Sequence, residues 1–345
     1  MQNSGFRVSR RGLLTSVAAG SAVAIAAAPG AARADDFLAA AEHSQAALVE
    51  RVQAALKGAK GTKLVLLGTS GGPVPGQLRG MTSHLMVSNG AAYVLDCGLG
   101  VTNQFARTGT AFKAVRAIFI THHHPDHNIE YGPFLVIGWV RGLLQNVSAF
   151  GPPPLTQMTE DFLRSQKVTI DFWAEDFERP PLQMIEVHDL PMAGPVMQDE
   201  NVKVTSVLVQ HPPVTPAYGY RFDFHDRSIA FSGDTVPLEA VAQMAKGADV
   251  LVHEASNFAA IEAFERRLLQ QGLLPTSIEA VMHHMHADHS PAEEVGRIAQ
   301  EAGVRTLVLS HLSPSDASVS DADWRAAAAQ FFKGEIIVGH DLMVI

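Results

Sequence analysis

The chain has 345 residues, of which 47% are hydrophobic, 18% are charged and 7% are aromatic, and its formal net charge is −9. This composition excludes a disordered chain, a collagen-like protein and a low-complexity protein. An acidic surface repels phosphate backbones, so the charge argues against a nucleic acid as the partner. The single cysteine, Cys97, excludes an intramolecular disulfide bond, and the sixteen histidines are the feature that most needs an explanation.

The first 34 residues have the pattern of an export signal. Arg10 and Arg11 precede an apolar run that reaches Ala28, and residues 32–34 form a small-x-small cleavage site. The apolar run is short and interrupted by glycine, serine and proline, which favours a cleaved twin-arginine-type signal over a membrane anchor. Cleavage would leave residues 35–345 with a net charge of −13, because the signal carries four arginines and no acid. We therefore expect a periplasmic or secreted protein without a stable membrane anchor.

Short runs rich in valine and isoleucine predict strands, and helical patterns lie between some of them. The region 35–60 is expected to be an amphipathic helix that stops near Gly58. The region 151–200, rich in proline and acids, is expected to be irregular. The expected strands are 63–67, 91–95, 117–120, 204–209, 218–224, 228–231, 250–252, 306–309 and 335–338, and the further helices are 238–246, 256–271, 291–302 and 321–332.

Two short segments have turn or capping chemistry. The segment 68–73 is a glycine loop whose N–H groups could approach an anion, although a simple tight turn is the favoured interpretation. No helix with P-loop lettering follows it, which argues against a nucleotide site. Ser290, Pro291 and Glu293 predict a capping box at the start of a helix that Gly303 ends.

The strongest chemical signal is the segment 121–127, which directly follows the expected strand 117–120. It places His122, His124, Asp126 and His127 within six residues. Imidazole and carboxylate groups are good ligands for zinc-like ions, and burying several of them without a metal or partners would be costly. Pro125 keeps the strand from continuing, so neighbouring side chains can converge. A solvated histidine run is the weaker alternative.

Three further donors each lie at or just past the C-terminal end of an expected strand: His211, Asp234 and His311. Such positions can meet at one edge of a layered α/β fold. The number of donors fits two divalent metal ions, for which Zn²⁺ is expected while manganese and iron stay open. A pair about 4 Å apart would activate a bridging water. The expected ligands are His122, His124 and His211 for one ion and Asp126, His127 and His311 for the other, with Asp234 as the bridge and His123 pointing away.

These motifs resemble the metallo-β-lactamase superfamily, and more closely its ribonuclease Z and arylsulfatase-like branch. The resemblance covers most of residues 61–345. It implies an α/β fold, a four-layer αβ/βα sandwich with a two-metal site at its edge, and it supports the ligand assignment above. It rests on the glycine loop 68–73, on Asp96, Cys97 and Gly98, on the histidine motif 122–127, on His211, on 232–235, on 253–255, on 288–303 and on 309–311.

The branch also implies roles for two residues outside the ligand set. Glu254 would orient His289, which would contact the scissile oxyanion or protonate the leaving group. Asp126 could in addition accept a proton from the attacking water. The alternative for Glu254 and His289 is an ordinary buried ion pair.

Several other residues keep two interpretations. His284, His286 and Asp288 repeat the ligand spacing of the first motif, so a further metal cluster is conceivable, but the absence of an expected strand before them favours a loop at the rim of the active site. Cys97 is expected to be a small packed residue. Four aromatic residues could line the substrate cleft or belong to the core: Trp139, Phe172, Trp173 and Tyr218.

Together these observations predict one hydrolase domain that spans residues 35–345 and cleaves a small-molecule ester, most favourably an aryl sulfate ester or a phosphodiester. The acidic charge, the export signal and the region 151–200, with three basic residues against ten acids, argue against a tRNA substrate. A lactonase or β-lactamase is the first alternative, since the same metals can polarise a carbonyl. The alternative of another class is a non-catalytic periplasmic metal-binding protein. A homodimer is compatible with the sequence.

Overall fold

The computed structural model describes residues 34–74, 79–180, 182, 185–273 and 276–345, with side chains from residue 44. Residues 47–345 form one compact unit, and the preceding described residues, 34–46, are assigned to another unit. The predicted signal and its cleavage site lie outside the described residues except for Ala34, the first residue of helix α1 (Ala34–Leu56). None of the described helices is long and apolar enough to cross a membrane.

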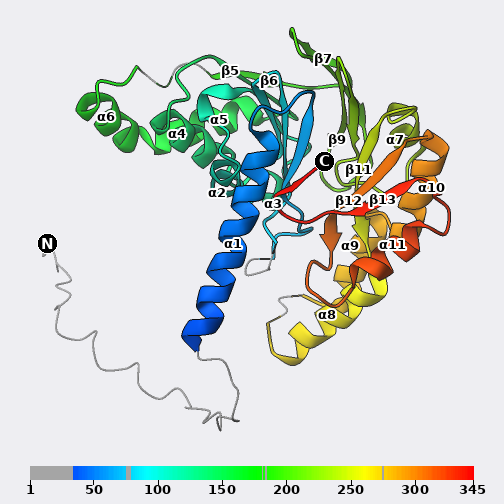
Figure 1. Cartoon of the computed structure of the whole chain (residues 1–345). Coiled ribbons are helices and arrows are strands. Elements are labelled where there is room, and N and C mark those ends of the chain that lie inside the picture. Colours follow the sequence, from blue (N-terminus) through cyan, green and yellow to red (C-terminus); the bar gives the residue numbers. More distant parts are fainter. Residues whose placement is uncertain (1–33, 75–78, 181, 183–184, 274–275) are drawn as a thin grey trace, which may run out of the picture. The chain divides into compact units, whose positions relative to one another are not determined.

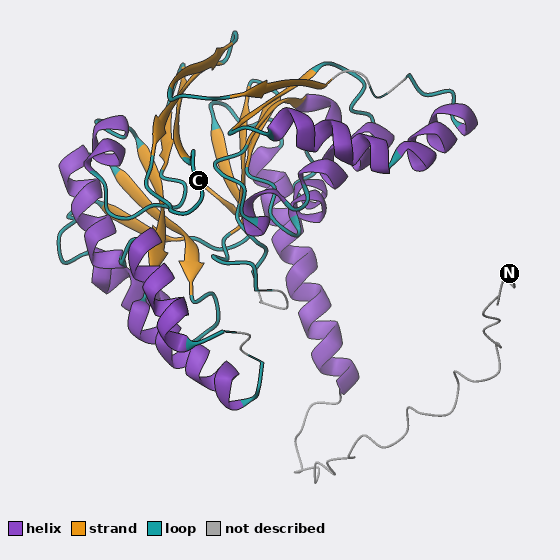
Figure 2. Cartoon of the chain, turned by 180° about the vertical axis from the view of Figure 1, so that it is seen from behind, coloured by secondary structure: helices purple, strands orange, loops and turns teal. Residues whose placement is uncertain are grey.

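Two seven-stranded mixed sheets form the centre of the compact unit (Figures 1 and 2). Each sheet has an antiparallel half and a parallel half. The first sheet has the order β14 (Met343–Val344), β1 (Lys63–Gly68), β2 (Ser83–Ser88), β3 (Ala91–Leu95), β4 (Val115–Phe119), β5 (Val147–Gly151), β6 (Ile185–Asp189). The second has the order β13 (Glu335–Val338), β12 (Thr306–Ser313), β11 (Val250–Ser256), β10 (Ser228–Phe231), β9 (Tyr218–Phe224), β8 (Val202–Leu208), β7 (Gly194–Gln198).

Helices cover the outer face of each sheet, which gives four layers. The first sheet packs against the C-terminal part of α1 and against α2 (Val101–Arg107), α4 (Tyr131–Val140) and α5 (Leu155–Ser165). The second packs against α7 (Glu239–Met244), α10 (Ala292–Ala302) and α11 (Asp321–Ala328). The remaining helices are η1 (Phe112–Ala114), α3 (Pro125–Asn128), α6 (Lys167–Asp176), α8 (Phe258–Gln270) and α9 (Ile278–Asp288). The predicted α/β four-layer sandwich is confirmed.

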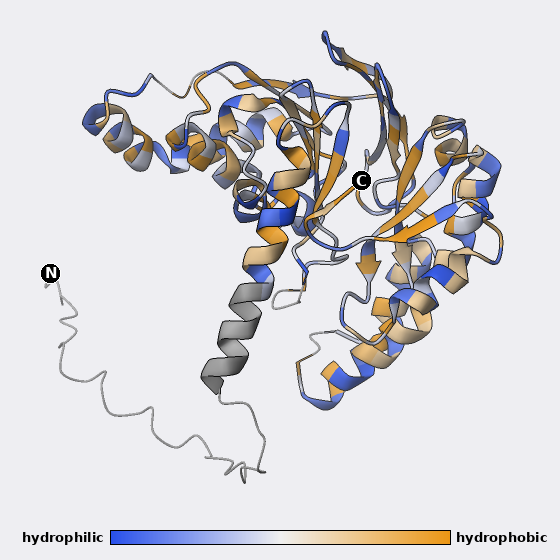
Figure 3. Ribbon diagram, viewed as in Figure 1, coloured by the Kyte–Doolittle hydropathy of each residue, from blue (hydrophilic) through white to orange (hydrophobic). Residues whose placement is uncertain are grey.

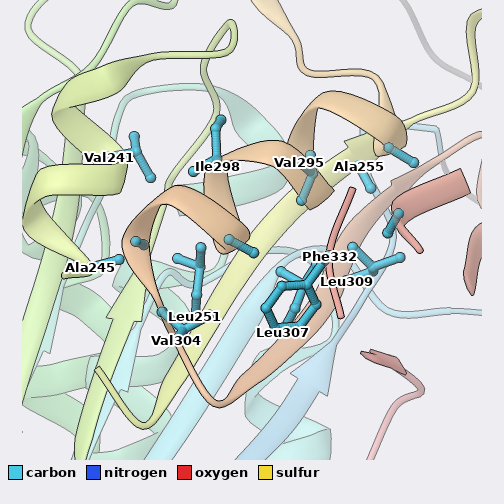
Figure 4. Packing of buried hydrophobic residues seen from close by; sticks show 14 of the residues in the cluster. Val241, Ala245, Leu251, Ala255, Val295, Ile298, Val304, Leu307, Leu309 and Phe332 are labelled. Carbon is cyan, nitrogen blue, oxygen red and sulfur yellow. The ribbon is translucent and has the colours of Figure 1, made fainter. Parts of the chain in front are cut away.

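The central parallel strands β11 and β12 are buried on both faces, as expected for strands between a helix layer and a second sheet. Strand β12 is buried along its whole length. Its residues Leu307 and Leu309 pack on the helices, whereas Val308 belongs to the core between the sheets. Figure 4 shows Val295 and Ile298 of α10 above this face, and Figure 3 shows the hydrophobic character of the central strands.

Three expectations about local structure are wrong. The region 151–200 is not irregular: it contains α5, α6, β6 and β7, because its prolines lie outside the helices and α5 buries Leu155 and Thr159 on one side. Residues 278–288 form helix α9 instead of a loop, and the side chain of Ser277 caps it. The capping box of α10 is absent, because the Ser290 hydroxyl donates to the carbonyl of Thr235 instead.

Aromatic side chains hold the two sheets together at Phe119. Its ring is fully buried, stacks on Phe150 of the same sheet at 5.4 Å, and meets Phe222 of the second sheet edge-on at 5.0 Å. Such pairs contribute beyond their buried area. Phe119 therefore joins the layers whose edges carry the candidate site.

We predict that Phe119→Ala lowers the free energy of unfolding by about 3–5 kcal/mol, because it leaves a cavity between the sheets. Urea unfolding followed by circular dichroism measures the change. Phe172→Ala is the matched control, since Phe172 is 56% exposed on α6 and its loss should change the stability by no more than about 0.5 kcal/mol. Equal effects of both variants would contradict the assigned role of Phe119. Phe119→Leu gives a milder change if the alanine variant does not fold.

Candidate dinuclear metal centre

The histidines and carboxylates singled out in the sequence meet where strands of both sheets end. The segment after β4 supplies the motif 122–127, in which Pro125 occupies the first position of the short helix α3. His211 follows β8, Asp234 follows β10, and His311 lies within β12. All except His124 are buried, and His124 is partly buried. The fold thus brings all seven predicted donors into one cluster.

Three imidazoles form the first group in this cluster. Nδ1 of His124 lies 3.1 Å from Nε2 of His122 and 3.0 Å from Nε2 of His211. One nitrogen of each ring lies within 4.8 Å of the nitrogens of the other two rings, so the three could bind a single metal ion. These three neutral nitrogens form a set that zinc-like ions favour.

Two carboxylates and two imidazoles form the second group, which consists of Asp126, His127, Asp234 and His311. Oδ2 of Asp126 lies 3.5 Å from Nε2 of His127 and 3.2 Å from Nε2 of His311. This group mixes oxygen and nitrogen donors, and it can therefore hold a second divalent ion.

The Asp234 carboxylate lies between the two groups. Its Oδ2 is 3.0 Å from Nε2 of His311 and 3.3 Å from Nε2 of His127 in the second group. The same oxygen is 3.9 Å from Nε2 of both His122 and His211 in the first group. Asp234 thus occupies the position that a bridging carboxylate requires.

A divalent cation suits the residues that are present. Nε2 of His127 is buried and has no hydrogen-bond partner, although it lies close to two carboxylates. Nδ1 of the same ring lies 2.9 Å from Oδ2 of Asp96 and donates its proton there, so Nε2 is the nitrogen left for the cluster. A buried polar atom without a partner is costly, and a divalent cation held by the Nε2 lone pair would satisfy it.

The pKa values of the cluster reflect its dense charge. Burial lowers the pKa of His311, but Asp234 and Asp126 raise it to about 10. Burial also lowers the pKa of His127, and the neighbouring carboxylates raise it well above its usual range. Burial brings the pKa of His124 down to about 4. Without a cation, protons on His127 and His311 balance the carboxylates, and a bound divalent ion would displace them.

Hydrogen bonds from outside the cluster fix the orientation of its rings. The Asp96 carboxylate, which holds His127, also accepts hydrogen bonds from the N–H and the hydroxyl of Thr121. Nδ1 of His211 donates to the backbone carbonyl of Asp288 at 3.1 Å. Both rings therefore use Nδ1 for the protein and direct Nε2 into the cluster, as metal-binding histidines do.

The glycine loop 68–73 holds one of the carboxylates. The N–H of Gly72 donates to Oδ2 of Asp126 at 3.0 Å. A Cβ atom on Gly71 would lie 2.8 Å from Nδ1 of His311, so the close approach requires glycine. The loop therefore approaches an anion after all, and that anion is a side chain of the cluster.

Glu254 and His289 form a pair beside the cluster. Nδ1 of His289 lies 2.8 Å from Oε2 of Glu254, and both side chains are buried. Oε1 of Glu254 accepts a hydrogen bond from the N–H of Thr235, next to Asp234. Burial lowers the pKa of His289, but Glu254 raises it above its usual value. The arrangement can hold a protonated imidazole at the edge of the cluster.

Comparisons with known proteins agree with this geometry. A family model described as "Beta-lactamase superfamily domain" matches residues 92–312. The chain is a member of the metallo-β-lactamase superfamily. Proteins named Ribonuclease Z from Mycobacterium bovis (strain BCG / Pasteur 1173P2) and from Mycobacterium sp. (strain KMS) are 32% and 33% identical over 286 residues, 81% of this chain and 96% and 94% of theirs. The predicted resemblance to the ribonuclease Z branch is thus confirmed.

Solved structures share the fold. A metallo-β-lactamase fold protein from Bacillus subtilis has a TM-score of 0.60 at 20% identity and covers 82% of this chain and 98% of its own. The short form of human tRNase Z has a TM-score of 0.58 at 20% identity, with the same coverage of both chains. This metallo-β-lactamase fold implies divalent metal ions, and the superfamily and the relatives support a metal-dependent hydrolase.

The named relatives contradict two predictions for this member of the superfamily. A small-molecule ester, such as an aryl sulfate, is wrong as the substrate, and so is the exclusion of nucleic acid as a partner. The lactonase or β-lactamase and the non-catalytic alternatives gain no support from them either. The physical reason is that net charge sums over the whole surface, whereas a phosphodiester meets the local field of the metal centre.

Several other residues considered in the sequence lie outside the cluster of seven donors. His123 bonds the carbonyl of Pro152, away from the cluster. Among the described residues, the groups able to hold a metal do not include His284, His286 and Asp288 as a set. His284 instead pairs with Asp288 and lines a cavity beside the cluster. Cys97 is buried as a free thiol. This cavity is not lined by any of the four aromatic residues considered for it: Trp139, Phe172, Trp173 and Tyr218.

Sequence reasoning assigned no role to Asp96, Thr121 or the backbone carbonyl of Asp288. Asp96 directly follows strand β3, next to the parallel strand β4 that leads to the histidine motif. A carboxylate at that position is a detectable signal, since it can reach the neighbouring strand end. The carbonyl of Asp288 leaves no signal in the side-chain pattern.

We predict that Asp234→Ala lowers the metal content from about two ions per chain to fewer than about one, because both groups lose their shared oxygen. Metal analysis of dialysed, zinc-loaded protein measures the content. Asp321→Ala is the control, since Asp321 also contacts a histidine, His340, but on the surface. Full occupancy in Asp234→Ala would exclude the bridging position.

Proposed function

We propose that this chain is a metal-dependent ribonuclease that hydrolyses phosphodiester bonds in RNA. The observation that carries the proposal is the cluster of seven donors beside the Glu254–His289 pair, in a chain that matches nearly the whole length of proteins named Ribonuclease Z. Structural similarity to human tRNase Z and to a long-form RNase Z from yeast supports the same fold for this chemistry.

We assign the two metal sites, with Zn²⁺ as the expected ion, to the two groups described above. His122, His124 and His211 would hold one ion. Asp126, His127 and His311 would hold the other, and Asp234 would contact both. When bound, such a pair supplies Lewis acidity toward the phosphodiester and lowers the pKa of a water molecule.

The chain's own groups would position the reactants and move protons. Asp126 is held by Gly72 and carries a pKa of about 2, because burial, which raises it, is outweighed by His127 and His311. It therefore stays ionised and can orient the attacking water. His289, held by Glu254, would donate a proton or a hydrogen bond to the departing oxygen. Breaking an RNA phosphodiester bond needs such a donor, since the leaving oxygen develops negative charge.

The acidic composition is compatible with an RNA substrate. The described residues that line the cavity beside the cluster include no lysine or arginine, so phosphate binding would depend on the metal centre. Binding then depends on few phosphates, and we expect a weaker dependence on salt than for a protein with many lysine and arginine contacts.

We predict that His289→Ala lowers kcat/KM for RNA cleavage about 10²–10⁴-fold while the metal content stays at the wild-type value. A gel assay on a labelled single-stranded RNA measures the rate, and metal analysis verifies the occupancy. His340→Ala is the matched control, because His340 also pairs with a carboxylate but lies on the surface. If His289→Ala cleaved RNA at the wild-type rate, His289 would not be the proton donor. If the wild-type protein itself cleaved no RNA, the proposed function would be refuted.

We also propose that the first 34 residues are an export signal and that the hydrolase domain spans residues 35–345, in the periplasm or outside the cell. The paired Arg10 and Arg11 before the apolar run support this proposal. We predict that the full chain, expressed in a bacterium with twin-arginine export, yields a periplasmic form that begins at Asp35, by mass spectrometry of the N-terminus. Lysine at both arginine positions should keep the protein uncleaved in the cytoplasm. An intact N-terminus in the wild-type protein would contradict the proposal.

A further inference from the structure

A cavity of about 240 Å³ opens directly beside the metal centre. One part of its lining is the centre itself, including Asp126, Asp234 and His289. The rest of the lining is mostly apolar and comes from helices α8 and α9, from the glycine loop and from the end of β12. Its apolar side chains include Ile261, Phe264, Val281, Met285, Pro73 and Pro314.

The chemistry of this lining selects one kind of group. An apolar wall without lysine or arginine does not favour a phosphate or a sulfate, which would lose hydration without a counter-charge. It favours a flat, uncharged group that can stack on an aromatic ring. Phe264 is the aromatic side chain of the wall, and the guanidinium of Arg267 lies 5.5 Å from its ring centre.

The size and position of the cavity restrict the group further. The volume is smaller than the roughly 300–1,000 Å³ of pockets for drug-sized ligands, so a single ring system fits and a base pair does not. Because the metal centre and the apolar wall line the same cavity, a substrate whose phosphodiester bond lies at the metals must place its neighbouring group against the wall.

We propose that this cavity binds one unpaired nucleobase, from a nucleotide that adjoins the scissile phosphodiester bond, with Phe264 as its stacking surface. The proposal rests on the proposed ribonuclease function. Stacking on an aromatic side chain tolerates all four bases, since every base has a π-face. Stacking in the cavity therefore selects an unpaired base at the cleaved bond, whichever of the four bases it is.

Polar groups at the cavity can contact the edge of the base. Glu265 of α8 and Ser315 after β12 belong to the lining. Burial raises the pKa of Glu265, so its carboxyl group retains its proton to a higher pH than an exposed one. A few polar groups in an apolar pocket are the usual means of orienting a ligand.

The test removes the base and the ring in turn. In zinc-loaded wild-type protein, kcat/KM is measured on a single-stranded RNA and on versions with one abasic nucleotide at each position around the cleaved bond. We expect that removing the base at one position next to the cleaved bond lowers kcat/KM about 10- to 100-fold. Phe264→Ala should show the same loss on intact RNA and no further loss on the abasic one, because the two changes remove one interaction.

Leu269→Ala is the matched control on the same helix. Leu269 is 49% exposed and does not line the cavity, so this variant should keep the wild-type rates and the abasic effect. Additive losses for Phe264→Ala and the abasic RNA, or no abasic effect at any adjoining position, would overturn the proposal while the ribonuclease function stands.

A binding measurement separates failure of this inference from failure of the function. If the wild-type protein cleaves no RNA, the proposed function fails, and calorimetric titration with uridine 5′-monophosphate and ribose 5-phosphate tests the cavity alone. Binding of the nucleotide about 10-fold tighter in the wild type, with the preference lost in Phe264→Ala, would support a base site. Equal binding of the two phosphates by the wild type would overturn it.

Discussion

A single carboxylate oxygen, Oδ2 of Asp234, lies within 3.9 Å of an imidazole nitrogen from each of four histidines. Four rings could not approach a buried charge so closely without support, since burial disfavours both the carboxylate and the imidazolium. The surrounding protein supplies that support through Asp96, the carbonyl of Asp288 and the glycine loop. The site is thus a charge arrangement that needs a rigid frame, and two packed sheets provide it.

The frame works because functional residues follow strands whose other residues form the core. Phe119 is fixed between the sheets, and only two residues separate it from His122. Phe231 is buried at the end of β10, three residues before Asp234. The packing of these strands on both faces therefore fixes where the donors lie. A small shift of one sheet against the other would change the distance between donors.

The sequence alone was sufficient where the determinants are local. The motif 122–127 combines a strand, a proline and four donors in one segment, and the apolar runs around 306 and 250 define central strands. Helix α9 was mispredicted as a loop because its histidines were compared with the metal motif, although Ile278, Val281 and Met285 recur at helical spacing. The partners of Asp96 and His211 come from distant segments, and sequence order does not reveal them. The substrate class was misjudged because a total charge carries no information about position.

Strand β12 contains a bulge at His311. Ser310 pairs with Glu254 and Leu312 with Ala255, which leaves His311 as the extra residue, with a φ of 46°. Leu307, Leu309 and Leu312 consequently all face the helices, although strict alternation would place Leu312 on the opposite side. The bulge lets one strand both supply a donor and pack on the helices. A substitution at 311 changes the donor and leaves the pairing and packing of Ser310 and Leu312 intact. Deleting the residue would remove the donor but would leave Leu312 facing the helices, because Leu312 would then directly follow Ser310 in strict alternation.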